Sequence, residues 1–122
     1  GQKVWTFRLS KRGLNSSVVV DGDRVFVSHS EENLETPKMG SIVCIDGSKE
    51  GDITESGLLW RRDGYTFGYA SPALANGRLY AVDNSANLYS IDPQTGDIHW
   101  EYSIGRVGKG SPVVTRDGVI YV

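Results

Sequence analysis

The sequence predicts an all-β protein in which a four-stranded antiparallel unit repeats about every 40 residues. Two spacings carry the repeat, because Trp60 and Trp100 are 40 residues apart and so are Ser71 and Ser111. No segment shows the i, i+3, i+4, i+7 apolar spacing of an amphipathic helix. The 15 glycines in 122 residues also suit a protein that is rich in turns.

The composition is that of an ordinary globular chain and argues against several classes of protein. Hydrophobic residues make up 39% and charged residues 23%, and the net charge of −2 offers no basic face for nucleic acid. No apolar run approaches the ~18 residues that span a bilayer, and no basic-then-apolar segment marks a signal peptide. The single cysteine, Cys44, excludes a disulfide framework and is expected to be a small buried hydrophobic residue.

The first half of the chain predicts five strands, separated by turns and by two insertions. Residues 3–9 alternate with a period of two, which is typical of a strand. Asp21-Gly22 between two β-branched runs indicates a tight hairpin. The insertions, residues 29–40 and 47–57, are polar and are expected to be loops. The five strands are expected at residues 3–9, 16–20, 24–28, 41–46 and 58–62.

The second half repeats this pattern in a tighter form. Asn76-Gly77 and Asp83-Asn84-Ser85 are turn sequences that separate runs rich in strand-forming residues. Four strands are expected at residues 71–74, 78–82, 87–91 and 98–102. A third cycle is expected to begin with strands at residues 111–114 and 119–122.

A four-stranded unit of about 40 residues has the size of a β-propeller blade. A β-sandwich is less favoured, because it does not predict Trp, Asp-Gly and Ser-Pro recurring in phase. Propellers need about four to eight blades to close a ring, so we expect an incomplete segment that behaves poorly in isolation. Its parts are expected to be an outer strand of a preceding blade (1–9), a blade with two insertions (15–64), a complete blade (70–104) and the first half of the next (110–122).

The most informative stretch is residues 90–100, SIDPQTGDIHW. Asp92 and Pro93 suit the first positions of a type I turn, where a side-chain acceptor and a fixed φ are favoured. Gly96 stands where the chain is expected to need a positive φ. Trp100 is expected to be buried between blades, so that its replacement by alanine would cost about 3–5 kcal/mol. Partial copies of the stretch occur at residues 1–5 and 45–60.

The pattern Ser90-x-Asp92-x-x-Thr95-Gly96-x-x-x-Trp100 resembles the tryptophan-docking motif of the pyrroloquinoline-quinone-like (PQQ-like) propeller repeat. Ser-Pro at the start of two units strengthens the likeness, which covers nearly the whole chain; the stretched first unit departs from the motif. The family includes quinoprotein dehydrogenases, the outer-membrane assembly lipoprotein BamB and bacterial sensor domains. The resemblance implies that each Trp packs flat against the next blade, and it implies a periplasmic, secreted or cell-envelope location.

The sharpest candidate for a ligand site is the acidic stretch at residues 29–35. His29 with Glu31 or Glu35 could bind a metal ion through nitrogen and oxygen ligands. A solvated surface loop is the favoured interpretation. The second histidine, His99, is expected to be exposed on an outer strand.

Three further stretches resemble known site motifs only in part. Residues 46–57 place oxygen side chains as a calcium loop does, but Gly57 stands where a bidentate glutamate is needed. Residues 105–111 suggest a phosphate loop, but a strand is expected to follow instead of a helix, so a connector between blades is favoured. Asn15-Ser16-Ser17 is a formal glycosylation sequence, a pattern too common to carry weight.

The sequence therefore assigns no catalytic, cofactor-binding or metal-binding residue, and we expect no cofactor in this segment. The leading hypothesis is a non-catalytic propeller scaffold from an exported bacterial protein. It would contact protein partners or a small ligand through residues 29–40 and 47–57, and pack against further blades. The alternatives are part of a PQQ-dependent dehydrogenase, or an extracellular sensor domain fused to another module. A dehydrogenase would imply a quinone, a calcium ion, a catalytic Asp and usually an adjacent Cys pair, and no position of this chain matches these groups.

Overall fold

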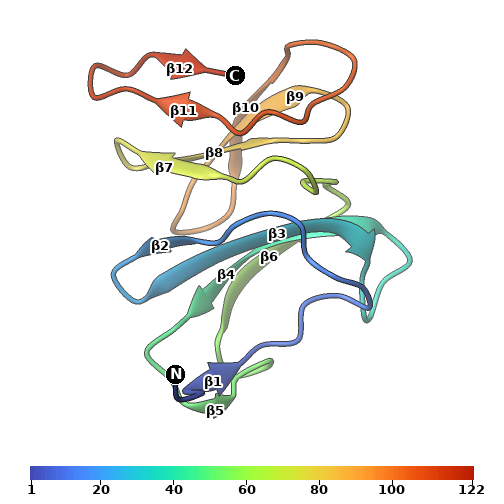
Figure 1. The fold of residues 1–122 in the computed structure, drawn as a ribbon, viewed down its shortest axis with the longest axis vertical. Coiled ribbons are helices and arrows are strands. Elements are labelled where there is room, and N and C mark those ends of the chain that lie inside the picture. Colours follow the sequence, from blue (N-terminus) through green and yellow to red (C-terminus); the bar gives the residue numbers. More distant parts are fainter.

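The chain forms a stack of β-sheets without any helix. The computed structural model describes all of residues 1–122. Figure 1 shows the sheets following one another in chain order, with the N-terminus and the C-terminus at opposite ends of the stack. The all-β prediction is confirmed, and the sheets do not close into a ring.

Twelve strands make up the fold. They are β1 (Trp5–Thr6), β2 (Val19–Asp21), β3 (Arg24–Glu32), β4 (Met39–Asp46), β5 (Gly51–Asp52), β6 (Leu58–Asp63), β7 (Ala73–Ala75), β8 (Arg78–Val82), β9 (Asn87–Ile91), β10 (Ile98–Ser103), β11 (Val113–Val114) and β12 (Ile120–Tyr121).

Two four-stranded antiparallel sheets form the body of the molecule. The first has the order β2-β3-β4-β6 and the second the order β7-β8-β9-β10, so each is a meander of neighbouring strands. The hairpin β11-β12 follows, and β1 pairs with β5 in a short parallel ladder. The expected turns lie between the first two strands of both sheets, with Gly22 at φ 58°, Asn76 at φ 51° and Gly77 at φ 70°.

The two insertions are more ordered than the sequence predicted. Residues 29–40 are not a free loop, because β3 runs on to Glu32 and β4 begins at Met39, so that they form the end of a long hairpin. The segment 47–57 contains β5 and buries Ile53. Local composition misled the prediction, because it does not show the pairing of β3 with β4 that orders residues 29–40. Nor does it show the packing of Ile53 in the second core cluster that orders residues 47–57. The predicted strand 3–9 is also too long, since only β1 is regular there.

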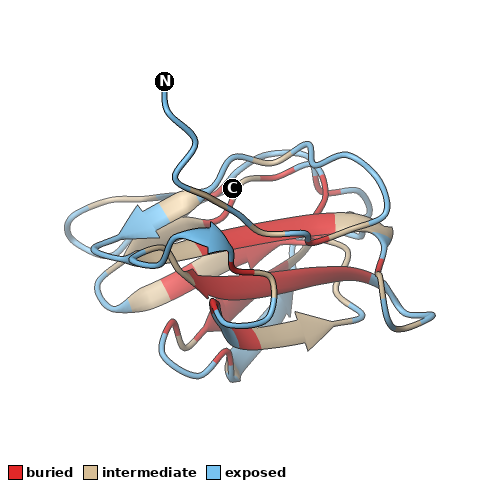
Figure 2. Ribbon diagram, turned by 90° about the horizontal axis from the view of Figure 1, so that it is seen from below, coloured by how far each residue is buried: buried red, intermediate tan, exposed pale blue.

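The main core lies between the two four-stranded sheets, where strands of both contribute side chains to one cluster. Its buried members are Phe26, Ile42, Cys44, Trp60, Phe67, Leu79, Ala81, Tyr89 and Ile91. Figure 2 shows the buried residues concentrated along the central strands, with exposed residues in the connections. A second cluster under β1 and β5 contains Leu9, Val27, Val43, Ile45 and Ile53. The burial of Cys44 agrees with its expected role as a small hydrophobic residue, and burial raises the pKa of its thiol.

Serine hydroxyls join the beginnings of successive units. The backbone N–H of Ser17 donates to Ser71 Oγ at 2.8 Å, and the N–H of Ser71 donates to Ser111 Oγ at 2.9 Å. The recurring serine of the sequence repeat therefore has a physical reason, since each hydroxyl accepts a hydrogen bond from the unit before it.

Candidate functional site

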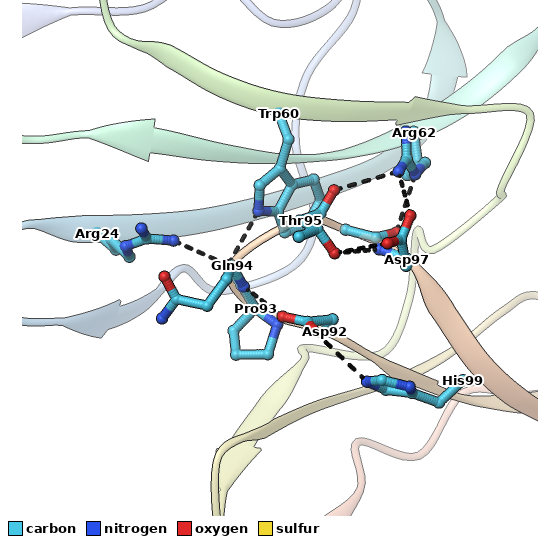
Figure 3. A network of polar contacts seen from close by, with 10 residues as sticks. Arg24, Trp60, Arg62, Asp92, Pro93, Gln94, Thr95, Asp97 and His99 are labelled. Atoms are coloured by element: carbon cyan, nitrogen blue, oxygen red, sulfur yellow. Dashed lines mark hydrogen bonds and ion pairs between the residues drawn. The ribbon is translucent and has the colours of Figure 1, made fainter.

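The two sheets are joined where Trp60 of β6 meets the turn of residues 93–96, between β9 and β10. The Trp60 side chain is only 7% exposed, and its Nε1–H donates to the carbonyl oxygen of Pro93 at 2.9 Å. Arg24 Nη1 of β3 donates to the same oxygen at 3.1 Å (Figure 3). One main-chain carbonyl of the second sheet is thus held by two side chains of the first.

A second arginine binds the far end of the same turn. Arg62, two residues after Trp60, donates from Nε to the Gly96 carbonyl at 2.9 Å. Its Nη2 donates to the Thr95 carbonyl at 3.2 Å and to Asp97 Oδ1 at 2.8 Å (Figure 3). Both charged side chains are partly exposed, so the ion pair itself contributes only about 0.2–1 kcal/mol. With its two carbonyl contacts, Arg62 ties β6 to the turn that lies against Trp60.

The turn is held in shape by its own residues. Asp92 Oδ1 accepts from the Gln94 N–H at 2.8 Å, and the Gly96 N–H donates to the Asp92 carbonyl at 2.8 Å. Thr95 Oγ1 donates to Asp97 Oδ2 at 2.9 Å. Gly96 has a φ of 75°, and a Cβ atom there would lie 2.6 Å from Cε3 of Trp60. Glycine is therefore required twice, for the backbone conformation and for the close approach of the indole ring.

The other two tryptophans lie in different surroundings. Trp5 packs against the second core cluster, near Gly47 of the turn that follows β4. Trp100 is 42% exposed, so the expectation that it is buried is wrong for this chain. The large cost predicted for alanine at Trp100 therefore belongs to Trp60.

The candidate metal ligand His29 lies inside the first sheet, with 1% of its surface exposed. Its Nδ1 accepts from the Glu31 N–H at 3.1 Å, which leaves the ring proton on Nε2 to donate to Ser41 Oγ at 2.8 Å. Both ring nitrogens are therefore used within the fold. Glu35 stands at the exposed end of the hairpin. The solvated-loop interpretation is wrong for His29, and the structure gives it a structural role in place of metal binding.

A partly buried network of polar side chains holds the same hairpin end as His29. Asn33 donates from Nδ2 to the carbonyls of Lys38 and Gly40, and its Oδ1 accepts from Arg61 Nη2 at 2.9 Å. Arg61 in turn pairs with Asp63 at 2.6 Å. Burial, followed by the charge of Arg61, lowers the pKa of His29. The hairpin end is thus held by a network that needs a neutral imidazole.

We expect the free energy of unfolding to fall as the pH drops below about 6.5, the ordinary pKa of histidine. Because the pKa of His29 is lowered in the folded chain, the unfolded chain binds a proton there at a higher pH than the folded chain does. Between the two pKa values the free energy of unfolding therefore falls with pH, and below the folded-state pKa this loss is complete. Urea midpoints between about pH 7.5 and 5 measure the effect. His29→Gln should flatten this slope, whereas His99→Gln at the exposed histidine should keep it. An equal slope in wild type and His29→Gln would show that the pH dependence does not come from His29.

The other candidate loops do not assemble a site. The carboxylate of Asp46 accepts from Ser48 N and Oγ, and that of Asp52 from Thr54 N and Oγ1, which lowers the pKa of both. Each carboxylate is thus held by its own local turn. No group of three or more His, Cys, Asp or Glu side chains lies together in a way that could hold a metal ion. The segment 105–111 is followed by β11, and no helix follows it.

Comparisons with known proteins place the chain in a family. The family model described as outer membrane protein assembly factor BamB matches residues 38–122. The chain belongs to this family. The resemblance to the PQQ-like repeats of BamB is thereby confirmed. No curated protein matches the sequence.

Solved structures support the BamB-like fold. The crystal structure of BamB from Moraxella catarrhalis is similar with a TM-score of 0.65 and 14% identity, over 91% of this chain and 30% of that chain. A europium-containing methanol dehydrogenase is similar with a TM-score of 0.53 and 14% identity, over 84% of this chain and 21% of that chain. This chain therefore spans less than a third of either protein. At this identity the likeness concerns the propeller fold alone.

The residues of this chain do not fit a quinone and metal site of the dehydrogenase type. Cys44 is a single buried thiol, and Asp46 and Asp52 are each engaged by their own turns. The fold also contains no helix long and apolar enough to cross a membrane.

Proposed function

We propose that the chain is a non-catalytic scaffold, a propeller segment that orders blades by tryptophan docking. The observation that carries the proposal is the joint in which Trp60, Arg24 and Arg62 hold the turn of the next sheet. Three side chains of the first sheet thus serve this contact with the second sheet. Membership of the BamB family supports a role in protein contacts in a bacterial cell envelope, outside the cytoplasm.

The surfaces proposed for partners are the two ends of the first sheet that carry the insertions. At the end of the β3-β4 hairpin, Glu35, Pro37, Lys38 and Met39 are exposed, on a base fixed by the His29 and Asn33 network. At the other insertion, exposed residues flank β5 while Ile53 anchors it. A rigid base with a variable exposed end is the usual arrangement for recognition on a scaffold.

The docking role predicts different solvent exchange at the two indole N–H groups. The Trp60 Nε1 proton is buried in a hydrogen bond, so we expect it to exchange only when the sheets separate. The Trp100 indole is half-exposed and should exchange rapidly. Nuclear magnetic resonance spectra recorded after transfer to heavy water measure both protons in one sample. Equal and rapid exchange of the two would contradict a closed joint at Trp60.

The choice between scaffold and dehydrogenase is tested by an activity assay of the protein. The protein is incubated with PQQ and calcium or europium, and the oxidation of alcohols and sugars is followed with a dye acceptor. The scaffold proposal expects no substrate-dependent reduction of the dye, with a quinoprotein dehydrogenase as positive control. Turnover that depends on added quinone would overturn it. Fractionation of the producing cells tests the envelope location separately.

A further inference from the structure

The N-terminal strand β1 carries a second strand along one of its edges. β5, from the second insertion, runs parallel to it (Figure 1). The N–H of Ile53, just after β5, donates to the Thr6 carbonyl at 2.9 Å. The N–H of Arg8 donates to Thr54 Oγ1 at 3.0 Å. Thr6 and Arg8 stand one and three residues after Trp5, so the edge of this tryptophan-bearing strand binds an extended segment through its main chain.

β6 corresponds to β1 and has a free edge. It is the last strand of the first sheet and pairs only with β4. The Gly64 N–H, just after β6, donates towards β4 to the Gly40 carbonyl at 2.9 Å. Backbone groups of successive residues in a strand point alternately to its two sides, so those of Arg61 and Asp63 point away from β4. These two residues stand one and three positions after Trp60, the places that bind the added strand in β1.

A short turn leaves this edge of β6 uncovered. The connection 47–57 is long enough to include β5, whereas the turn 92–97 leads directly into β10. At the start of β6, Leu58 and Leu59 are 36% and 47% exposed. β6 has neither the proline nor the lysine that commonly blocks pairing at an open edge, and both of its arginines are engaged in ion pairs. An open edge with free backbone groups and exposed apolar residues is a template for strand addition.

Arg62 indicates the charge of the segment that this edge accepts. Its Nε and Nη2 bind the neighbouring turn, its Nη1 makes no hydrogen bond, and its side chain is 37% exposed. Residues opposite each other in neighbouring strands have their side chains on the same face of the sheet. A carboxylate opposite Arg62 would therefore lie beside the free nitrogen, where a charge-assisted hydrogen bond is favourable. An apolar side chain opposite Leu59, three positions earlier, would cover that leucine.

We propose that the free edge of β6 binds an extended segment of a partner protein as a parallel fifth strand of the first sheet. The segment carries an apolar residue beside Leu59 and, three positions later, an acidic residue beside Arg62. One of its N–H groups donates to the Arg61 carbonyl, as that of Ile53 donates to the Thr6 carbonyl in β1. The inference rests on the proposed scaffold function and adds a partner site outside the two insertions.

A synthetic peptide based on β5 tests the proposal with the protein. It spans residues 49–55 with Glu50→Leu and Ile53→Glu, which places the apolar and the acidic residue as required by the register of β1 and β5. Ile53 is the buried anchor of β5, so a peptide without it does not replace β5 itself. Added at millimolar concentration, the peptide should shift the backbone N–H signals of Arg61 and Asp63 saturably in magnetic resonance spectra.

Two modified peptides distinguish strand addition from other contacts. Methylation of the backbone nitrogen at position 53 should weaken binding about tenfold, because the hydrogen bond to the Arg61 carbonyl is lost. A spin label at the N-terminus of the peptide should broaden the N–H signal of Leu58 more than that of Asp63, because a parallel strand begins beside the start of β6.

The specificity of the edge is tested by charge and by the second sheet. A peptide with Ile53→Gln in place of Ile53→Glu should bind severalfold more weakly, and high salt should remove this difference. β10 is the free edge strand of the second sheet and carries Tyr102 where β6 carries Arg62. The Glu101 N–H signal of β10 should therefore not respond to the peptide.

The proposal is overturned if the methylated peptide binds equally well, if Glu101 responds as Arg61 does, or if the label broadens Asp63 more than the start of β6. It is also overturned if the Arg61 and Asp63 signals shift with protein concentration without peptide, because a second copy of the chain would then occupy the edge. The Trp60 indole serves as the internal reference. If its proton exchanges rapidly, the scaffold function itself fails; if it is protected while Arg61 and Asp63 do not respond, only the present inference fails.

Discussion

Replacing Trp60 with alanine is expected to lower the free energy of unfolding by about 3–5 kcal/mol, the usual range for loss of a large buried aromatic side chain. The indole lies in the main core, with Phe26 at a centroid distance of 6.1 Å. Its removal also takes one of the two donors from the Pro93 carbonyl. Urea unfolding followed by circular dichroism measures the change.

Trp100→Ala is the matched control for Trp60→Ala. The same residue type occupies the same strand position with the same aromatic neighbour, but it is 42% exposed. We expect a loss of about 1 kcal/mol or less, as at other exposed sites. Trp60→Phe, which keeps most of the apolar surface and loses the N–H donor, should cost about 1–2 kcal/mol. Equal losses at Trp60 and Trp100 would show that the joint does not stabilise the chain.

The sequence predicted those parts of the fold that depend on neighbouring residues. The turns at Asn76-Gly77 and at residues 92–96 follow from local backbone preferences, and β8 and β9 begin and end at the predicted residues. These elements have short-range causes: a residue tolerant of positive φ, a proline, and alternating apolar side chains. Such signals can be read from a short stretch of sequence without knowledge of the rest of the chain.

The hairpin end at residues 29–40 could not be predicted in the same way. Its polar side chains suggested a loop, but they bond to one another in the interior, as His29 does to Ser41 and Asn33 to Gly40. Buried polar networks have no periodic apolar signature. Only the pairing of β3 with β4 shows that these side chains face inwards.

The arginines of the joint were also missed, although a signal for them existed. Arg24 and Arg78 each stand two residues before an aromatic residue, at the same phase of the repeat. Comparing the repeats column by column would have singled them out. The acceptor could not be inferred, because Arg24 and Pro93 are 69 residues apart and meet only when the two sheets stack.

Gly96→Ala is expected to destabilise the chain by about 2–5 kcal/mol. A left-handed backbone costs an alanine about 1–2 kcal/mol, and overpacking adds about 1–3 kcal/mol. Both terms apply here, because φ is 75° and the new Cβ would lie 2.6 Å from Trp60 Cε3. Gly77→Ala is the control for the first term alone, since its φ is 70° and nothing lies within 4 Å of the added carbon.

Trp60 and Gly96 can be combined in a double-mutant cycle that isolates the contact between them. In a Trp60→Ala background the ring is gone, so Gly96→Ala should cost no more than Gly77→Ala does in the wild type. The coupling energy between the two positions is then about 1–3 kcal/mol, the range for residues in direct contact. Additive losses would mean that Gly96 is required only for its backbone angle. Gly96 would then serve only the turn of the second sheet, and of the two contacts only the hydrogen bond to the Pro93 carbonyl would position the Trp60 indole.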